Sequence, residues 1–155
     1  MTPAITIVKQ DKVPFLLHEY DHDPSVELYG PEAAEKLGVD PRRVFKTLIA
    51  TINVKDYAVG VLPVSMQLDL KLFAHALEAK KAALADGKAA ERITGYVLGG
   101  VSPLGQRKKL KTIIDDSATR YPTIFVSAGR RGLQIELSPK DLAALTKARL
   151  AAIGK

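Results

Sequence analysis

One lysine stands in an apolar stretch where a charged side chain is unusual. Lys46 lies within residues 44–52, whose composition is typical of a β-strand. Side chains alternate between the two faces of a strand, so the neighbours of Lys46 on its own face are Val44 and Leu48, both apolar. If both faces are covered, the ammonium loses water, its pKa falls and it becomes a directed donor to a substrate oxygen. The alternative is an edge-strand lysine whose stem lies along the sheet while its head reaches water.

A glycine-rich stretch is the second feature with chemical potential. Residues 95–106 read GYVLGGVSPLGQ, and four cations follow within residues 107–111. The paired glycines Gly99 and Gly100 let the backbone approach a ligand closely. Exposed amides in such a turn can bind an oxygen that carries negative charge, and nearby cations favour phosphate. A tight turn that leads into a solvated basic segment is the alternative.

Other reactive side chains lack the spacing of a known site. His18, Asp21, His22 and Asp23 are metal-ligand types, but no HExxH or equivalent spacing occurs, and Asp-His-Asp-Pro is an ordinary turn composition. Ser102 lacks the Gly-x-Ser-x-Gly elbow of serine hydrolases. We therefore expect neither a metal ion nor another cofactor.

The composition of the 155-residue chain limits the possible classes of protein. It contains no cysteine, which excludes disulfides, zinc–thiolate sites and thiol nucleophiles. No apolar run approaches the ~20 residues that cross a membrane, and the N-terminus lacks the layout of a secretory signal, so we expect a cytoplasmic protein. The net charge of +6 favours a polyanionic partner. The absence of tryptophan argues against broad base-stacking surfaces, so contacts to nucleic acid should go to phosphates or to one terminal base.

The elements that must position these groups are short helices and strands. Capping residues and apolar spacing predict helices over residues 3–12, 30–38, 69–77, 86–93 and 138–152, with Thr2, Asp69, Asp86 and Ser138 as N-terminal caps. Alternation and turn signals predict strands over residues 15–20, 44–52, 57–64, 111–115, 123–127 and 133–137, and residues 80–85 fit either state. Residues 44–52 and 57–64 should pair as a hairpin across the turn at 53–56. We expect one mixed α/β domain over residues 1–155, with a largely antiparallel sheet or barrel-like β core surrounded by helices. The hairpin at 123–137 would place Ser127 beside Arg130 and Arg131, although a solvated hairpin tip is the alternative.

Four segments in order resemble a known family. They are residues 20–24 (YDHDP), 45–48 (FKTL), 94–106 (TGYVLGGVSPLGQ) and 126–133 (VSAGRRGL). With these segments the chain resembles the YbaK-type Cys-tRNA(Pro) deacylases. Their superfamily includes the editing domain inserted in bacterial prolyl-tRNA synthetases. The resemblance covers essentially all 155 residues.

The resemblance implies the editing-domain fold and a free-standing editing enzyme that acts in protein biosynthesis. Such an enzyme hydrolyses mischarged Cys-tRNA(Pro) to cysteine and free tRNA(Pro), often in a complex with prolyl-tRNA synthetase. The substrate's own thiol attacks its ester carbonyl, so no protein nucleophile or metal is needed, and the enzyme would be classed as a lyase if the thiol cyclises.

The resemblance also implies a set of site residues. Lys46 is the family's essential residue, and a group of pocket residues surrounds it: Tyr20, Thr47, Gly99, Gly100, Ser102, Pro103 and Ser127. The basic run itself, and not the resemblance, makes Arg107, Lys108 and Lys109 candidate contacts to the tRNA backbone, separate from this pocket.

Two points stay open at the level of sequence. Some relatives carry an aspartate where this chain has Gln134, and Glu136 cannot simply replace it, because residues two apart on a strand lie ~7 Å apart. Substrate preference therefore stays open, with Ala-tRNA(Pro) as the rival substrate. A non-catalytic tRNA- or synthetase-binding module is the rival from another class, although such a module has no need of a desolvated lysine.

Overall fold

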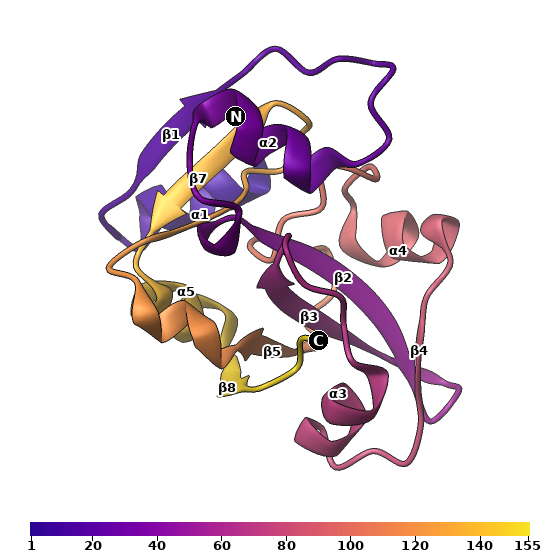
Figure 1. The fold of residues 1–155 in the computed structure, drawn as a ribbon. Helices are drawn as coiled ribbons and strands as arrows, with labels where there is room; N and C mark the ends of the chain where they lie inside the picture. The colour runs from indigo at the N-terminus through magenta and orange to yellow at the C-terminus, as the bar shows by residue number, and fades with distance from the viewer.

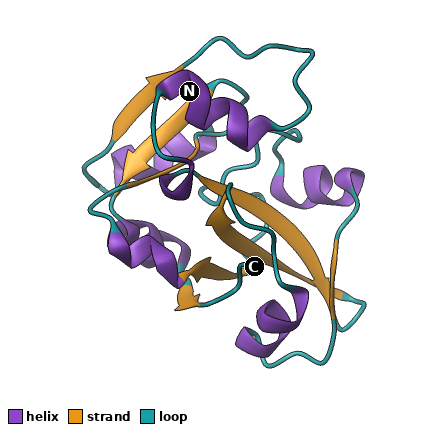
Figure 2. Cartoon of the chain, viewed as in Figure 1, coloured by secondary structure: helices purple, strands orange, loops and turns teal.

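Two β-sheets carry the fold in the computed structural model, which describes all of residues 1–155 (Figures 1 and 2). The smaller sheet is antiparallel, and its strand order is β1 (Leu16–Glu19), β7 (Leu133–Leu137), β6 (Ile124–Ser127). The larger sheet has the order β4 (Ala82–Leu84), β2 (Phe45–Ile52), β3 (Asp56–Pro63), β5 (Lys111–Asp115), β8 (Arg149–Ala151). A single parallel bridge between Val44 and Phe125 joins the two sheets.

The expected hairpins form, and two parallel pairs join them. Strands β2 and β3 pair antiparallel over their full length, from Phe45 opposite Pro63 to Ile52 opposite Asp56. Strands β6 and β7 form the second hairpin. Strand β5 pairs parallel with β3, and β8 pairs parallel with β5. The mixed α/β class is therefore confirmed, with one antiparallel and one mixed sheet.

Short capped helices surround the sheets. They are α1 (Pro3–Gln10), α2 (Tyr29–Leu37), α3 (Leu70–Ala76), α4 (Gly87–Thr94) and α5 (Pro139–Thr146), with 3₁₀ turns at Pro41–Arg43 and Asp116–Arg120. The predicted caps at Thr2, Asp69, Asp86 and Ser138 each accept a backbone N–H of the first helical turn. None of these helices is long and apolar enough to cross a membrane.

Two hydrophobic clusters cover the two faces of β2. Phe45 and Ile49 pack with side chains from both sheets and from α1 and α5. On the other face Ala50 and the partly buried Leu48 belong to a cluster with Phe73 of α3 and residues near the C-terminus. Lys46 lies on this second face, because it precedes Leu48 by two residues.

Two sequence expectations need adjustment. The C-terminal helix ends at Thr146 rather than near residue 152, and Lys147 takes a left-handed conformation with φ of 54°. Residues 149–151 leave the helix because they pair with β5, a contact that local helix propensity cannot foresee. Residues 82–84 form a strand because they pair with the far end of β2.

The buried carboxylate of Asp115 holds the C-terminal segment against the larger sheet. Its Oδ1 accepts the N–H groups of Ile153 at 2.9 Å and Gly154 at 3.2 Å, and its Oδ2 accepts the N–H of Ser117 at 3.2 Å. The residue is 3% exposed. Water therefore cannot easily replace these three bonds.

Asp115→Ala is expected to lower the free energy of unfolding by about 3 kcal/mol, because it leaves buried backbone donors without an acceptor. Urea-induced unfolding measures the change. The neighbouring exposed Asp116 is the matched control, and Asp116→Ala should change stability by about 0.5 kcal/mol or less. Equal losses for the two variants would contradict the role given to Asp115.

Candidate active site

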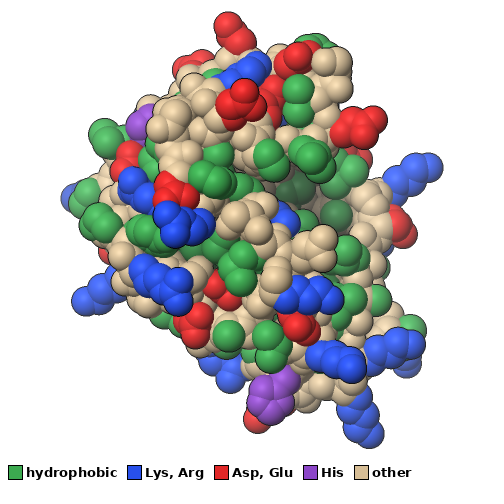
Figure 3. All heavy atoms as spheres, in the orientation of Figure 1, with side chains coloured by type: hydrophobic (Ala, Val, Ile, Leu, Met, Phe, Trp, Pro, Cys, Tyr) green, Lys and Arg blue, Asp and Glu red, His purple; other side chains and the backbone are tan.

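A cavity of about 580 Å³ opens near the bridge between Val44 and Phe125. It is lined by the start of β2, the end of β6, the start of α2 and the loop after α4. Its wall residues include Leu28, Tyr29, Val44, Phe45, Lys46, Thr47, Leu48, Val64, Met66, Leu98, Gly99, Val101, Ser127 and Gln134. The face drawn in Figure 3 is hollowed between α2 and α4, and hydrophobic side chains border the hollow. Mostly apolar walls with a few polar groups are typical of a small-molecule site.

Lys46 brings a cation into this apolar wall. Its strand partner is Leu62, and its side chain is partly buried. Burial lowers the pKa of the Lys46 ammonium, and no carboxylate or hydrogen bond opposes this effect. Of the two alternatives from the sequence, the structure favours a partly desolvated ammonium over an edge-strand lysine whose ammonium is fully hydrated. An unpaired ammonium in an apolar wall is a strong donor to a ligand oxygen.

Two buried oxygens near the lysine have no hydrogen-bond partner. They are Oγ1 of Thr47 and Oε1 of Gln134, and both residues line the cavity. A buried polar atom without a partner costs about 1–3 kcal/mol. In a native structure such an atom calls for an explanation. Each of these oxygens has less than 1 Å² of accessible surface, so a ligand could provide the missing partner only if the side chain turned towards the cavity.

The paired glycines allow one protein segment to touch another. A Cβ on Gly99 would lie 2.8 Å from Nε of Arg131 and 2.9 Å from the ring of Tyr29. A Cβ on Gly100 would lie 2.7 Å from the Cα of Arg130. Gly99 also has φ of 84°, a conformation that favours glycine. The sequence analysis expected these glycines to approach a ligand, whereas in the structure their close neighbours are the β6–β7 turn and α2. Gly99 itself also lines the cavity.

Arg131 connects the three segments at the cavity mouth. Its Nε donates to the carbonyl oxygen of Leu98 at 2.8 Å, and its guanidinium lies 4.8 Å from the ring centroid of Tyr29. Two leucines at this mouth remain open to solvent, since Leu28 is 69% exposed and Leu98 is 41% exposed. Together they offer an apolar surface beside the entrance.

The structure brings four of the sequence-predicted pocket residues together. Lys46, Thr47, Gly99 and Ser127 all line the cavity. The hydroxyl oxygen of Ser127 accepts the N–H of Gly129 at 3.1 Å, which holds it at the end of β6.

The other predicted pocket residues lie outside the cavity wall. Gly100 and Ser102 are buried, and Oγ of Ser102 accepts the N–H of Leu104 at 3.2 Å. Pro103 lines a second cavity instead. Tyr20 donates its backbone N–H to Gly132 at 3.0 Å, and burial raises the pKa of its phenol.

The basic run is separate from the cavity of Lys46. Arg107 is exposed, and its guanidinium donates to the carbonyl oxygen of Arg92 at 3.5 Å. Lys108 and Lys109 are exposed residues at the second cavity, where Pro103 also lies.

The histidine and aspartate side chains of residues 18–23 point to different partners. His22 Nδ1 lies 2.7 Å from the buried carboxylate of Glu32, whereas His18 Nε2 lies 2.8 Å from Glu136. Asp23 accepts hydrogen bonds from Ser25. These side chains serve the loop and the smaller sheet rather than one common site.

Sequence reasoning missed the residues that complete the cavity from other elements. Leu28 and Tyr29 come from a loop and a helix start and carry no periodic signal. Val64 ended a predicted strand and Val101 lay within a recognised segment, but neither was identified as a site residue. Arg131 stood within a recognised segment, but its contact with Leu98 depends on tertiary structure.

Gly100→Ala is expected to lower the free energy of unfolding by about 2 kcal/mol, because the new methyl group meets rigid backbone. Gly38→Ala is the control. Gly38 has φ of 67°, and a Cβ added there would have no other atom within 4 Å, so only backbone strain of about 1 kcal/mol should appear. Denaturation curves compare the two. A smaller loss for Gly100→Ala than for Gly38→Ala would contradict the close approach.

Lys46→Met is expected to stabilise the protein at pH 7. Because the pKa of Lys46 is lowered in the folded state, the unfolded chain binds the proton more readily, and stability from this group rises with pH. The increase in the free energy of unfolding caused by Lys46→Met should be largest below the lowered pKa of Lys46. It should vanish above the ordinary lysine pKa of about 10.4. Urea midpoints of both proteins across this range test it. A gain that persisted unchanged at the highest pH would contradict the desolvation account.

Comparison with known proteins gives a consistent assignment. The family model of the aminoacyl-tRNA editing domain matches residues 24–145. An Enterococcus faecalis protein named "Putative Cys-tRNA(Pro)/Cys-tRNA(Cys) deacylase EbsC" is 40% identical over 156 residues, which cover 98% of this chain and 92% of that protein. The uncharacterised protein YwhH of Bacillus subtilis is 31% identical over 111 residues, which cover 72% of this chain and 70% of that protein.

The fold has a counterpart among solved structures. A crystal structure of "a putative trans-editing enzyme for prolyl tRNA synthetase" superposes with a TM-score of 0.83 at 21% identity, covering 100% of this chain and 99% of that one. That likeness supports the fold. The family model and the 40% identical relative show that the chain belongs to the aminoacyl-tRNA editing domain family, as an enzyme of the YbaK-type deacylase group.

Proposed function

We propose that this enzyme hydrolyses mischarged Cys-tRNA(Pro) and releases cysteine and free tRNA(Pro). The observation that carries the proposal is the unpaired ammonium of Lys46 in the wall of an apolar cavity. The name of the E. faecalis relative supports the choice of cysteine and of tRNA(Pro).

The side chains of the cavity favour chemistry that the substrate performs on itself. No histidine lines the cavity, and the hydroxyl of Thr47 has no hydrogen-bond partner, while that of Ser127 only accepts the N–H of Gly129. Neither hydroxyl is hydrogen-bonded to the carboxylate of Glu27 or the amine of Lys46 in the same wall, so neither has the positioned base that activates a nucleophile. In the proposed reaction the cysteine sulfur bonds to the ester carbonyl carbon. The ester C–O bond breaks, and the thiol proton ends on the terminal ribose hydroxyl. The product is a cyclic thioester within the cysteine, and water then cleaves its C–S bond to give cysteine.

In this reaction Lys46 stabilises negative charge and fixes the substrate. Its ammonium donates to the ester carbonyl oxygen or to an oxygen of the tRNA 3′ end. A fixed cation in a cavity of low polarity stabilises a developing oxyanion far more than a cation in water does. The N–H of Gly100 donates to the carbonyl of Val97 at 2.9 Å and is not free for an oxyanion, so the loop contributes wall residues at Leu98, Gly99 and Val101.

The two ends of an aminoacyl-adenosine, the adenine and the aminoacyl group, match two different parts of the cavity. The exposed Leu28 and Leu98 provide an apolar surface for the terminal adenine. The unpartnered oxygens of Thr47 and Gln134 become acceptors for the amino group or thiol of the aminoacyl part when their side chains turn towards the cavity. Prolyl-tRNA synthetase is the proposed protein partner. Arg107, Lys108 and Lys109 are the proposed contacts to the tRNA backbone.

Lys46→Ala is expected to lower deacylation of Cys-tRNA(Pro) by at least 100-fold, the scale of removing one oxyanion donor. The assay uses tRNA(Pro) charged with cysteine, alanine or proline, with the native protein and the variant. Circular dichroism and unfolding curves establish that the variant folds. The native protein should prefer the cysteinyl ester.

Three results would contradict this proposal in different ways. Full activity of Lys46→Ala would remove the lysine from the mechanism. Faster hydrolysis of the alanyl ester would assign the Ala-tRNA(Pro) specificity instead. Binding of tRNA without hydrolysis of any ester would indicate a non-catalytic module.

A further inference from the structure

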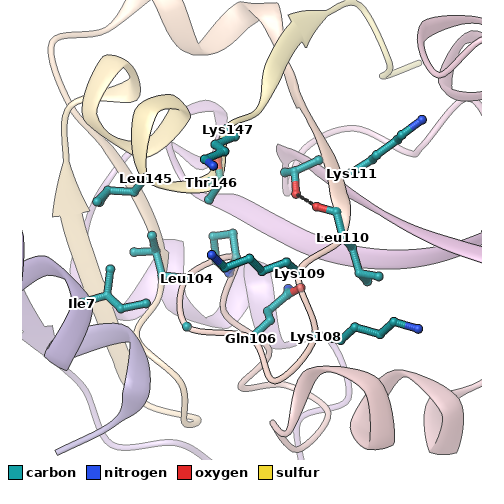
Figure 4. A pocket seen from close by; sticks show the side chains of 13 residues that line it. Ile7, Leu104, Gln106, Lys108, Lys109, Leu110, Lys111, Leu145, Thr146 and Lys147 are labelled. Atoms are coloured by element: carbon teal, nitrogen blue, oxygen red, sulfur yellow. Dashed lines mark hydrogen bonds between the residues drawn. The ribbon is translucent and has the colours of Figure 1, made fainter.

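A second cavity, of about 350 Å³, lies along the same loop as the first (Figure 4). Residues 98, 99 and 101 line the cavity of Lys46, whereas residues 103–106 line the second one. Its other walls are Ile7 of α1, residues 108–112, and residues 145–147 at the end of α5. The loop therefore forms part of the wall of both cavities.

The second cavity is rich in cations that have no counter-ion. Its lining includes Lys108, Lys109, Lys111 and Lys147 but no acidic residue, and none of these lysines forms an ion pair. Figure 4 shows Lys109 and Lys147 reaching into the same space from two sides, while Lys108 and Lys111 point away from it. Two neighbouring ammonium groups repel one another, and an anion between them removes that repulsion.

The other polar side chains of this cavity already donate to the backbone. Thr146 Oγ1 donates to Leu142 O at 2.8 Å, and Gln106 Nε2 donates to Ser102 O at 3.0 Å. Thr112 Oγ1 donates to Leu110 O at 3.1 Å. The two converging ammonium groups are therefore the strong donors left for a ligand.

The size and the apolar walls indicate a ligand larger than a free phosphate ion. Ile7, Leu104, Leu110 and Leu145 line the cavity beside the lysines. A volume of about 350 Å³ lies within the range of ~300–1,000 Å³ typical of sites for small organic ligands. A ribose and base on the apolar walls, with a phosphate at the ammonium groups, match both features.

Lys147 has a left-handed backbone conformation, which glycine usually occupies at the end of a helix. It follows the last turn of α5 with φ of 54° and ψ of 35°, a conformation that glycine adopts without strain. A non-glycine residue is strained in this conformation. A cation at a helix C-terminus offsets part of that strain, and binding of an anion gives a further reason for lysine at this position.

We propose that the second cavity binds a nucleotide unit of the tRNA 3′ strand, with its phosphate between Lys109 and Lys147. This inference rests on the proposed function, in which the strand ends in the cavity of Lys46. Four residue steps separate Gly99 from Pro103, so their backbones lie at most ~14 Å apart. A single strand of a few nucleotides can span that distance.

The test compares a double variant at this cavity with a matched double variant elsewhere. Lys109→Gln with Lys147→Gly removes both ammonium groups, and glycine at position 147 relieves backbone strain, so the fold should be kept. Lys55→Gln with Lys71→Gln removes the same charge from exposed residues that line neither cavity. Fluorescence anisotropy with uncharged tRNA(Pro) over a series of salt concentrations gives the affinity and its salt dependence.

The cavity variant should bind tRNA several-fold more weakly, with a salt slope that is smaller by about 1, as expected for loss of one phosphate contact. The control pair should change both quantities much less. For hydrolysis of charged tRNA, the loss should appear in KM rather than in kcat. Equal tRNA affinity and equal salt slope for the cavity variant and the control pair would overturn the proposal. This result is independent of the effect of Lys46→Ala on deacylation, which tests the proposed function.

A second measurement separates tRNA from a free nucleotide. AMP and inorganic phosphate are titrated into the native protein and the cavity variant and followed by NMR. Weak binding of AMP that the cavity variant loses, together with weaker tRNA binding, supports the proposal. AMP binding with unaltered tRNA affinity would overturn it in favour of a site for a free nucleotide.

Discussion

The candidate site depends on one close contact between two backbone segments. The loop at Gly99 and Gly100 lies against the turn at Arg130 and Arg131 so closely that a single Cβ on Gly100 would meet the backbone opposite. This contact lets Arg131 reach the carbonyl of Leu98 and the ring of Tyr29, which fixes the entrance of the cavity. The loop, the β6–β7 turn and α2 are distant in the sequence, and this one approach places them around Lys46.

The cavity holds polar groups that the protein itself leaves unsatisfied. Burial disfavours the charge of Lys46, and the buried oxygens of Thr47 and Gln134 lack donors. Each of these features costs stability. Functional sites often contain strained or desolvated groups that lower the stability of the fold, because those groups are needed to bind or activate a ligand. The rest of the fold offsets the cost with two well-packed clusters and the buried anchor at Asp115.

The loop after α4 gives the protein two different surfaces. Near Leu98 and Gly99 it contributes an apolar wall next to one desolvated cation, which suits chemistry at an ester. Near Gln106 and Lys109 it contributes to a basic cavity, which suits the phosphates of a nucleic acid. The buried Ser102 between them accepts a backbone N–H and so stabilises the turn that separates the two surfaces.

The sequence by itself determined the local elements and the chemical types of the main residues. Caps at Thr2, Asp69, Asp86 and Ser138, and the alternation that sets Lys46 among apolar neighbours, are encoded within a few residues. Four ordered segments were enough to predict the family. Tertiary structure alone decided that β5 and β8 pair in parallel, and that Ser102 and Pro103 lie outside the cavity while Leu28 and Val101 line it. These outcomes depend on contacts between residues far apart in the chain, and neither propensity nor spacing records such contacts.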